Sequence, residues 1–438
     1  NQMKLRVNLD QMISPHFDYV LYSSALNKVL KGGRGSTKSS VISLQIVLDF
    51  LQDENANALI IRKVANTIEL SVYEQIKWAI YMIGVQSQFA FTKSPYRITH
   101  KPTGTSFYFS GLDDPAKLKS MIIAKGYICQ LWFEELAEFS SWEEVDTVRA
   151  SFTRKVLPPG KHVVTYYSYN PPKNPYDWIN EWVSQKMGKD KWYVDHSTYQ
   201  DVTLPDILAE DYLDEIETVK QNDYNYYQWM YKGKVIGLGN SIYNMDLFYE
   251  INQLPDNDYI AQLAYSIDVG HQTSATTCLC IGLTGKNNVI LLDTYYYSPA
   301  GQTKKKSPGE LARDIHDFIA DSASAYPNAP IVKRTIDSAE GGLRNQYYSD
   351  YGTRLHGVNK AMRKETMIDY PQELLAQGRV FILRKKTNEI FITQHQQYRW
   401  DEKTIATSDP KVIKENDHTC DAFQYFCFDN KRLLGLKK

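Results

Sequence analysis

A glycine-rich stretch near the start of the chain limits its possible folds more than any other feature. The stretch runs from Lys28 to Ser40 and has the sequence KVLKGGRGSTKSS. A short apolar run enters it, and residues 41–50, VISLQIVLDF, follow it with the apolar density of a buried helix. A strand, a glycine-rich loop, a Lys-Ser pair and a helix in this order are typical of a phosphate-binding loop.

The backbone N–H groups of such a loop cradle phosphate oxygens, and the helix N-terminus adds a favourable dipole. Lys38 is expected to pair with the β- and γ-phosphates, and the Ser39 hydroxyl to reach Mg²⁺. The pattern prefers glycine before the lysine, where Thr37 stands, and we expect a negative φ there because a β-branched residue disfavours positive φ. The alternative is a glycine-rich turn before a buried helix. The predicted nucleotide contacts are Gly33, Arg34, Gly35, Ser36, Thr37, Lys38 and Ser39.

Composition bounds the class of protein. A chain of 438 residues predicts two or three domains, and a net charge of −1 means that any contact with a polyanion must be local. No apolar run approaches the ~18 residues of a membrane span, and the first residues lack the apolar core of a signal peptide, so we expect neither a membrane protein nor a secreted one. The five cysteines form no CxxC pair and are expected to be reduced thiols in a cytosol-like compartment.

The first part of the chain alternates strands with helices, which predicts an α/β domain with a mostly parallel sheet. Ligands of such sheets bind beyond the carboxyl ends of the strands. Glu134 and Glu135 follow one predicted strand, and Ser168 and Asn170 end the next. We predict that Glu134 lies near the Mg²⁺ shell, that Glu135 orients the attacking water, and that Ser168 and Asn170 sense the γ-phosphate. The alternatives are solvated carboxylates and a turn before two prolines. The predicted strands are residues 57–62, 105–111, 127–133 and 162–168.

Three domains are predicted. Residues 1–195 form the P-loop ATPase domain, and Arg149 or Arg154 in it is a candidate finger supplied in trans to a neighbouring site, with an ordinary helix surface as the alternative. Residues 196–250 are polar, acidic and tyrosine-rich with helical spacing, and are interpreted as a linker or lid subdomain. Residues 251–438 form the third predicted domain, which is a second block of strands and helices.

Three aspartates mark the second block. Asp268 and Asp337 each end a predicted strand, and Asp421 lies in the first turn of a late apolar helix. Strand, hairpin, helix, strand and final helix, with acids at these places, are the layout of a ribonuclease-H-like nuclease. Such sites gather carboxylates around two metal ions, and hard oxygen ligands suit Mg²⁺ or Mn²⁺. The alternative is a set of capping and solvated acids.

His418 stands beside the third aspartate. It is a candidate catalytic residue, because an imidazole there can assist the metal or protonate the leaving group. A helix-capping role is the alternative.

Six motifs occur in one order along nearly the whole chain. They are GGRGSTKS at 32–39, LWFEE at 131–135, YNPP at 169–172, YSIDVG at 265–270, IDSAE at 336–340 and DHTCD at 417–421. In this combination the chain resembles the large terminase subunit of tailed bacteriophages, of the type found in phages of Gram-positive bacteria.

The resemblance implies a viral DNA-packaging motor. Its ATPase would translocate double-stranded DNA into a procapsid while docked as a ring on the portal protein, and its nuclease would cut concatemeric genomes. A small terminase subunit would select the DNA. The site of action would be the cytoplasm of the infected bacterial host, at the procapsid. Whether the chain is a monomer in solution stays open.

The resemblance also implies cofactors and roles. ATP with Mg²⁺ would occupy the first site, and Mg²⁺ or Mn²⁺, as two ions, the second. Glu135 would be the catalytic glutamate, Asn170 would lie in the coupling segment, and the metal ligands of the nuclease would be Asp268, Asp337 and Asp421.

The chain departs from the family pattern at Thr37, where glycine is common, and at Glu134, where an aspartate often stands. Two other functions are alternatives. A repair helicase-nuclease should carry a second RecA-like domain, and none is recognisable after residue 200. An ATP-gated DNA-binding assembly factor with an inactive nuclease fold would not need the three aspartates.

Overall fold

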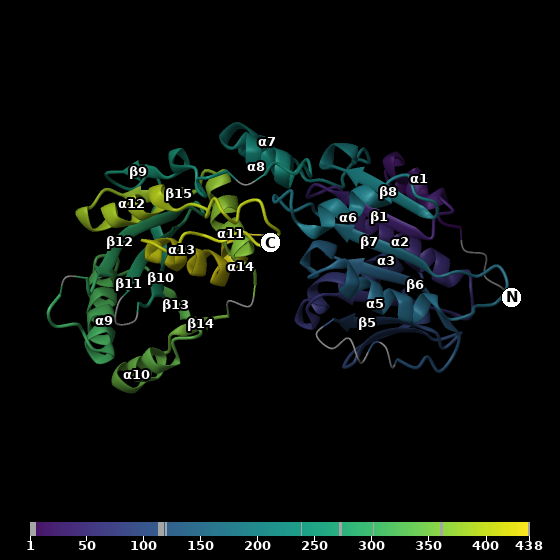
Figure 1. The fold of residues 1–438 in the computed structure, drawn as a ribbon, viewed down its shortest axis with the longest axis horizontal. Coiled ribbons are helices and arrows are strands. Elements are labelled where there is room, and N and C mark those ends of the chain that lie inside the picture. Colours follow the sequence, from purple (N-terminus) through teal and green to yellow (C-terminus); the bar gives the residue numbers. More distant parts are fainter. Residues whose placement is uncertain are drawn as a thin grey trace. The chain divides into compact units, whose positions relative to one another are not determined.

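The structure is a computed structural model that describes residues 6–112, 118, 121–237, 239–270, 274–300, 302–359 and 362–436. The chain divides into two compact units (Figure 1). The first comprises Asn1–Ile216 with Tyr227–Gly237, and the second comprises Glu217–Tyr226 with Leu238–Lys438. In the described part of the chain, no helix has the length and apolar character that crossing a bilayer requires. The three-part division at residues 195 and 250 stays a prediction.

The N-terminal unit contains an eight-stranded sheet with the order β3-β4-β5-β2-β6-β7-β1-β8. The predicted parallel pairing is confirmed for β1 with β7 and β8, β2 with β5 and β6, and β6 with β7, whereas β3, β4 and β5 pair antiparallel. The strands are β1 (Asn27–Gly32), β2 (Ala56–Arg62), β3 (Phe89–Lys93), β4 (Tyr96–His100), β5 (Ser106–Gly111), β6 (Tyr127–Glu134), β7 (Val164–Tyr169) and β8 (Trp192–Ser197).

Helices cover both faces of this sheet, because its central strands carry apolar residues on both sides. Leu30 and Ile60 pack in one core with α2 (Lys38–Leu51) and α3 (Glu74–Ile83). Their neighbours Val29 and Ile61 pack in a second core with α5 (Trp142–Thr153) and α6 (Trp178–Lys186). The short helix α1 (Asp18–Tyr22) belongs to this unit, and α7 (Glu210–Asn222) and α8 (Tyr224–Met230) each contribute residues to both units.

The C-terminal unit contains a seven-stranded sheet with the order β14-β13-β10-β11-β12-β15-β9. The strands β10, β11 and β12 pair antiparallel, and β13 joins β10 in parallel, as the ribonuclease-H-like layout predicted. The strands are β9 (Tyr249–Ile251), β10 (Ile260–Asp268), β11 (Thr276–Thr284), β12 (Val289–Tyr297), β13 (Ile331–Asp337), β14 (His356–Val358) and β15 (Val380–Leu383).

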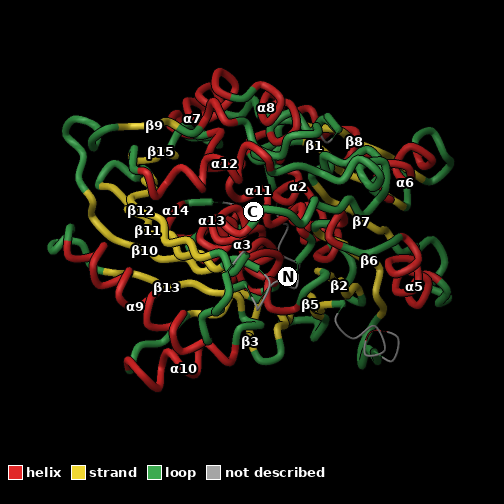
Figure 2. Tube along the Cα trace, turned by 60° about the vertical axis from the view of Figure 1, so that its left-hand side comes forward, coloured by secondary structure: helices red, strands yellow, loops and turns green. Residues whose placement is uncertain are grey.

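Residues along β10 alternate between the two faces of this sheet, and this alternation sets the site. Tyr265 and Ile267 lie in a core with α9 (Pro308–Ser324) and α10 (Gly341–Tyr351). Ser266 points the other way, and its Oγ donates to the Ala422 carbonyl of α13 (His418–Asp429) at 2.6 Å. Asp268 therefore lies on the α13 side, where Figure 2 also draws α13 along β10. The same face carries α11 (Lys364–Ala376) and α12 (Glu389–Gln397), and α14 is Lys431–Leu434.

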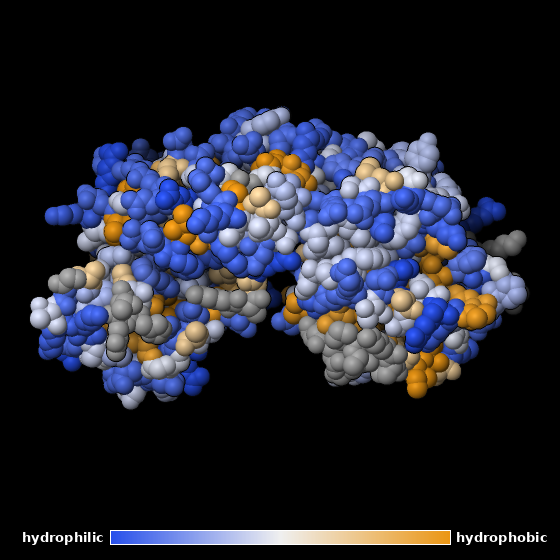
Figure 3. All heavy atoms as spheres, in the orientation of Figure 1, coloured by the Kyte–Doolittle hydropathy of each residue, from blue (hydrophilic) through white to orange (hydrophobic). Residues whose placement is uncertain are grey.

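The apolar side chains of the chain are gathered in these cores. The face drawn in Figure 3 is mostly hydrophilic with scattered apolar residues, which is the usual composition of a protein surface. Four cysteines are buried and Cys129 is half-buried, and none of the five is paired in a disulfide in the described part of the chain.

Candidate nucleotide and nuclease sites

The glycine-rich loop joins the end of β1 to the start of α2, and its backbone is held from two sides. The Gly33 N–H donates to the Ser197 carbonyl of β8 at 2.9 Å, and the Arg34 N–H donates to the Met230 carbonyl at 2.8 Å. Gly35 has a φ of +80°. The expectation of a negative φ at Thr37 is wrong, because its φ is 66°. The turn from loop to helix imposes the left-handed conformation here, and the threonine adopts it despite its branched Cβ.

Lys38 is buried with its ammonium group at the centre of the loop. The Nζ donates to the Gly33 carbonyl at 3.0 Å, to the Ser36 Oγ at 3.0 Å and to the Asn170 Oδ1 at 2.9 Å. Burial lowers the pKa of Lys38 to about 8, against the charges of nearby acids, chiefly Glu135. The ammonium is thus surrounded by neutral oxygens, which the oxygens of a phosphate can replace.

Glu134 ends β6 on the same face of the sheet as α2. The Ser39 Oγ lies 3.5 Å from the Glu134 Oε1, and the Arg62 guanidinium at the end of β2 forms an ion pair with the same carboxylate. Burial, followed by the charge of Glu135, raises the pKa of Glu134 to about 7, and Arg62 opposes this shift. Glu135 has a φ of 53°, an uncommon conformation for a non-glycine residue that is found preferentially at functional sites.

Of the other predicted residues of this unit, only Asn170 contacts the phosphate-binding loop in the described part of the chain. Asn170 reaches Lys38, as described, but the Ser168 Oγ accepts a bond from the buried Trp132 Nε1 at 2.8 Å and faces the core. The Arg149 guanidinium bonds the Asp146 carboxylate at 2.6 Å and lies over the Trp142 ring. Arg154 is exposed at the end of α5. The choice between the two arginines stays open.

In the C-terminal unit two of the predicted aspartates end neighbouring strands. Parallel pairing aligns Ile267 of β10 with Ile336 of β13, so Asp268 and Asp337 follow at adjacent positions of the sheet edge. Asp421 comes from the first turn of α13, which packs on β10.

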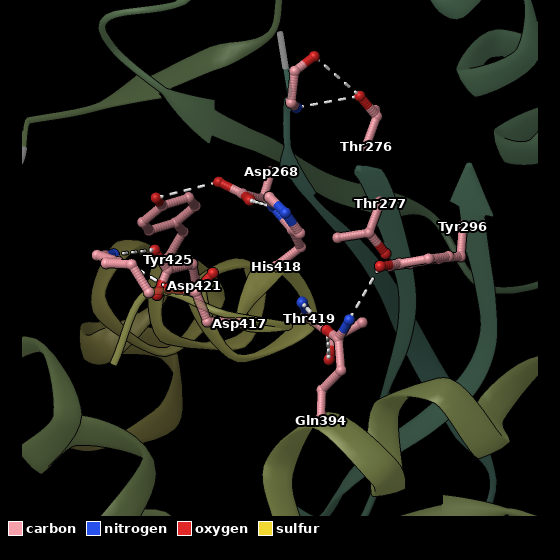
Figure 4. A network of polar contacts seen from close by, with 12 residues as sticks. Asp268, Thr276, Thr277, Tyr296, Gln394, Asp417, His418, Thr419, Asp421 and Tyr425 are labelled. Carbon is pink, nitrogen blue, oxygen red and sulfur yellow. Dashed lines mark hydrogen bonds and ion pairs between the residues drawn. The ribbon is translucent and has the colours of Figure 1, made fainter. Parts of the chain in front are cut away.

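The Asp268 carboxylate is held by two residues of α13 (Figure 4). Its Oδ2 lies 2.8 Å from the His418 Nδ1, and its Oδ1 accepts a bond from the Tyr425 hydroxyl at 3.2 Å. Burial alone would lower the pKa of His418, but the bond to Asp268 and the charges of Asp268, Asp417 and Asp421 outweigh it and raise this pKa. The imidazole is therefore biased toward its protonated form, as a proton donor needs.

Asp421 is neutralised by basic side chains. Lys364, the first residue of α11, forms an ion pair with its Oδ1, and the Lys414 Nζ lies 3.3 Å from its Oδ2. The Tyr398 hydroxyl lies 3.5 Å from the same carboxylate.

The Tyr425 hydroxyl contacts one of the three predicted aspartates, Asp268. Burial raises the pKa of Tyr425, and the charges of Asp268, Asp421 and Asp337 raise it further, in this order. Carboxylate oxygens are the ligands that Mg²⁺ and Mn²⁺ prefer, so the chemistry of the donor set fits a divalent cation. Within the described ranges, however, no group of three or more His, Cys, Asp or Glu side chains is arranged to hold a metal ion. A cation would compete with Lys364 and Lys414 for Asp421.

Several residues of these sites were not predicted. Tyr425 was accessible to sequence reasoning, because it lies four positions after Asp421 and seven after His418 on one helical face. Arg62 and Glu134 are 72 positions apart in the sequence, and Lys364 and Asp421 are 57 apart, so no local sequence pattern predicts either ion pair.

Comparison with known proteins identifies the family. The model of the phage terminase large subunit matches residues 24–234, and the model of the terminase RNase H-like domain matches residues 268–429. The chain belongs to the phage terminase large subunits. The two matches fall on the units that carry the glycine-rich loop and the three aspartates, respectively.

Relatives from Bacillus support this membership. The large terminase subunit of Bacillus phage SPP1 is 39% identical over 238 residues, which are 53% of this chain and 56% of that protein, so the match spans about half of this relative. The PBSX phage terminase large subunit of Bacillus subtilis is 24% identical over 97% of this chain and 95% of that protein.

Solved structures show the same fold. The large terminase of a thermophilic bacteriophage superimposes with a TM-score of 0.77 at 19% identity, over 96% of this chain and 99% of that one. The same phage protein has also been solved in complex with ATP-gamma-S, and that form matches with a TM-score of 0.74 at 18% identity, over 94% of this chain and 98% of that one.

Proposed function

We propose that this terminase large subunit is an ATP-driven motor that moves double-stranded DNA into a procapsid and a metal-dependent endonuclease that cuts the concatemeric genome. The observation that carries the proposal is the presence of two separate sites in one chain. Lys38 meets Asn170 beside the glycine-rich loop. In the ribonuclease-H-like unit, Asp268 and Asp337 end neighbouring strands, and Asp421 lies in the first turn of α13, which packs on β10. Membership in the terminase family supports the assignment of both.

ATP hydrolysis would use the residues around the loop. The backbone N–H groups of residues 35–39 and the Lys38 ammonium would bind the phosphates, and the Ser39 hydroxyl with Glu134 would hold Mg²⁺, which would supply positive charge beside the transferred phosphoryl group. Glu135 orients the attacking water. The complex of the thermophilic phage terminase with ATP-gamma-S supports nucleotide binding by this fold.

DNA cleavage would use the C-terminal aspartates. Asp268, Asp337 and Asp421 would hold divalent cations, Mg²⁺ or Mn²⁺ and two in number, which activate water and stabilise the leaving oxygen. His418, oriented by Asp268, would assist this site or protonate the leaving oxygen. Lys364 and Lys414 would have to release Asp421 before a cation binds it.

The partners follow from the family. A portal protein would receive the motor as a ring of identical subunits, and a small terminase subunit would select the DNA. The place of action would be the cytoplasm of the infected bacterium, at the procapsid.

A packaging reaction tests the motor. Isolated procapsids with portal protein, linear double-stranded DNA and ATP are mixed with the wild type or Lys38→Ala, and DNase-resistant DNA is measured. Protection by the wild type and none by Lys38→Ala is the expected result. If the wild type hydrolyses no ATP with DNA and procapsids present, the motor function is wrong. ATP-dependent strand separation without protection would favour the helicase-nuclease alternative.

A further inference from the structure

Residues 229–231, at the end of α8, join two parts of the nucleotide site that are far apart in sequence. One part is the glycine-rich loop, and the other is the segment 170–173 that follows β7. All of these residues belong to the N-terminal unit. No role was predicted for residues 229–231 beyond their place in the linker or lid.

The contact with the glycine-rich loop is made by backbone. The Met230 carbonyl accepts the Arg34 N–H at 2.8 Å. A Cβ added to Gly33 would lie 1.8 Å from the Tyr231 carbonyl oxygen, so this glycine allows an approach that any side chain would prevent. Residues 230 and 231 therefore lie directly against the loop.

The contact with segment 170–173 is made by the side chain of Trp229. Its indole Nε1 donates to the Pro171 carbonyl at 2.8 Å in a buried hydrogen bond, and the Lys173 Nζ lies 4.0 Å from the centre of its ring. Asn170 is the first residue of this segment, directly after β7, and its amide oxygen accepts a bond from the Lys38 ammonium.

The hydrogen bond to Trp229 matters because of the composition of this segment. Pro171 and Pro172 have no backbone N–H, so the segment cannot hold its place through donors of its own at these positions. Its carbonyl groups must serve instead. The Pro171 carbonyl accepts the hydrogen bond from Trp229, and the Lys173 carbonyl accepts one from the Gly237 N–H at 3.1 Å.

We propose that Trp229 is a positioning residue for ATP hydrolysis, which fixes Pro171 and through it the Asn170 amide beside the phosphate-binding loop. The proposal rests on the ATPase function proposed above. Met230 anchors residues 229–231 to the glycine-rich loop, so these residues tie the position of Pro171 to that of the loop. Loss of the indole N–H loosens Asn170 but leaves the phosphate-binding backbone intact.

Trp229→Phe tests this role, because phenylalanine keeps an aromatic ring near Lys173 and removes the N–H donor together with part of the ring volume. Trp178→Phe is the matched control, since the Trp178 Nε1 also donates to a backbone carbonyl, that of Phe139, at 2.9 Å in the same unit. Steady-state ATP hydrolysis is measured for the wild type and both variants. We expect kcat to fall about five- to tenfold in Trp229→Phe, as for the loss of one hydrogen bond, with KM within about twofold. Trp178→Phe should keep both values.

Two results would overturn the inference alone. One is equal kcat in the two variants, and the other is a rise of KM in Trp229→Phe with kcat unchanged. A wild type that hydrolyses no ATP would overturn the proposed function together with the inference.

Discussion

At the scale of single residues, Thr37 and Lys364 have conformations or contacts that the sequence motifs do not predict. Thr37 adopts a positive φ because the loop must turn into α2 there. Lys364 forms an ion pair with Asp421, a carboxylate proposed to hold a metal ion. Each residue departs from what its type suggests, and each departure has a measurable consequence.

Thr37→Gly should raise the free energy of unfolding. The left-handed conformation costs a residue with a Cβ about 1–2 kcal/mol, and glycine avoids this cost. Glycine also loses more chain entropy on folding, which offsets about 0.5–1 kcal/mol, so we expect the free energy of unfolding to rise by ~0.5–1 kcal/mol. Urea unfolding measures it. Thr147→Gly is the control, because Thr147 lies exposed within α5, and the lower helix propensity of glycine should cost about 0.5 kcal/mol there. Equal effects of the two changes would contradict the strain at Thr37.

Lys364→Met should tighten the binding of Mn²⁺. Removal of an ammonium group that competes for Asp421 should lower the dissociation constant about fivefold, a modest effect because the pair is partly exposed. Isothermal titration calorimetry with Mn²⁺ measures this directly and does not depend on DNA cleavage. Lys403→Met removes the same charge at an exposed position of the same unit and should leave the constant unchanged. Weaker Mn²⁺ binding by Lys364→Met would mean that Lys364 supports the metal site.

At the scale of elements, periodicity and turn chemistry predicted most of the fold. The predicted bounds of β2, β5, β6 and β7 lie within two residues of the observed ones, because buried strands and their polar ends differ sharply in composition. Their parallel order followed from the alternation with helices. The contacts of α11 with the nuclease site and of α8 with the phosphate-binding loop were not predicted, since both depend on how distant elements pack.

The helix α12 carries a buried histidine whose protonation should destabilise the protein. His395 lies among the aromatic side chains of Tyr243, Phe248 and Phe391, and burial lowers its pKa to about 3. An unfolded histidine titrates near 6.5, so the neutral form contributes fully above about pH 6.5, and this contribution is lost as pH falls toward 3.

His395→Phe should therefore reduce the acid sensitivity of the protein. Between pH 7.5 and pH 5 the wild type should lose about 2 kcal/mol of unfolding free energy more than the variant, because about 1.5 pH units separate pH 5 from the pKa of the unfolded histidine. Urea unfolding at the two pH values measures the difference. His162→Phe, at an exposed position, should lose as much as the wild type. Equal losses in His395→Phe and the wild type would show that His395 does not titrate on unfolding.

At the scale of the whole molecule, the proposed function places ATP hydrolysis and DNA cleavage at two sites of one chain. The two belong to separate compact units with their own sheets and cores. Each site is built from residues of its own unit, so a single substitution should disable one chemistry and leave the other intact. The two activities should be independent, because a motor that also cleaves DNA must be able to translocate it without cutting it.

The most direct test measures both activities in three proteins. The wild type, Lys38→Ala and Asp268→Ala are each assayed for phosphate release from ATP and for cleavage of supercoiled plasmid with Mg²⁺ or Mn²⁺. We predict that Lys38→Ala loses ATP hydrolysis and keeps cleavage, and that Asp268→Ala loses cleavage and keeps ATP hydrolysis. Loss of both activities in either variant, or cleavage by Asp268→Ala equal to that of the wild type, would contradict the account of two separate sites.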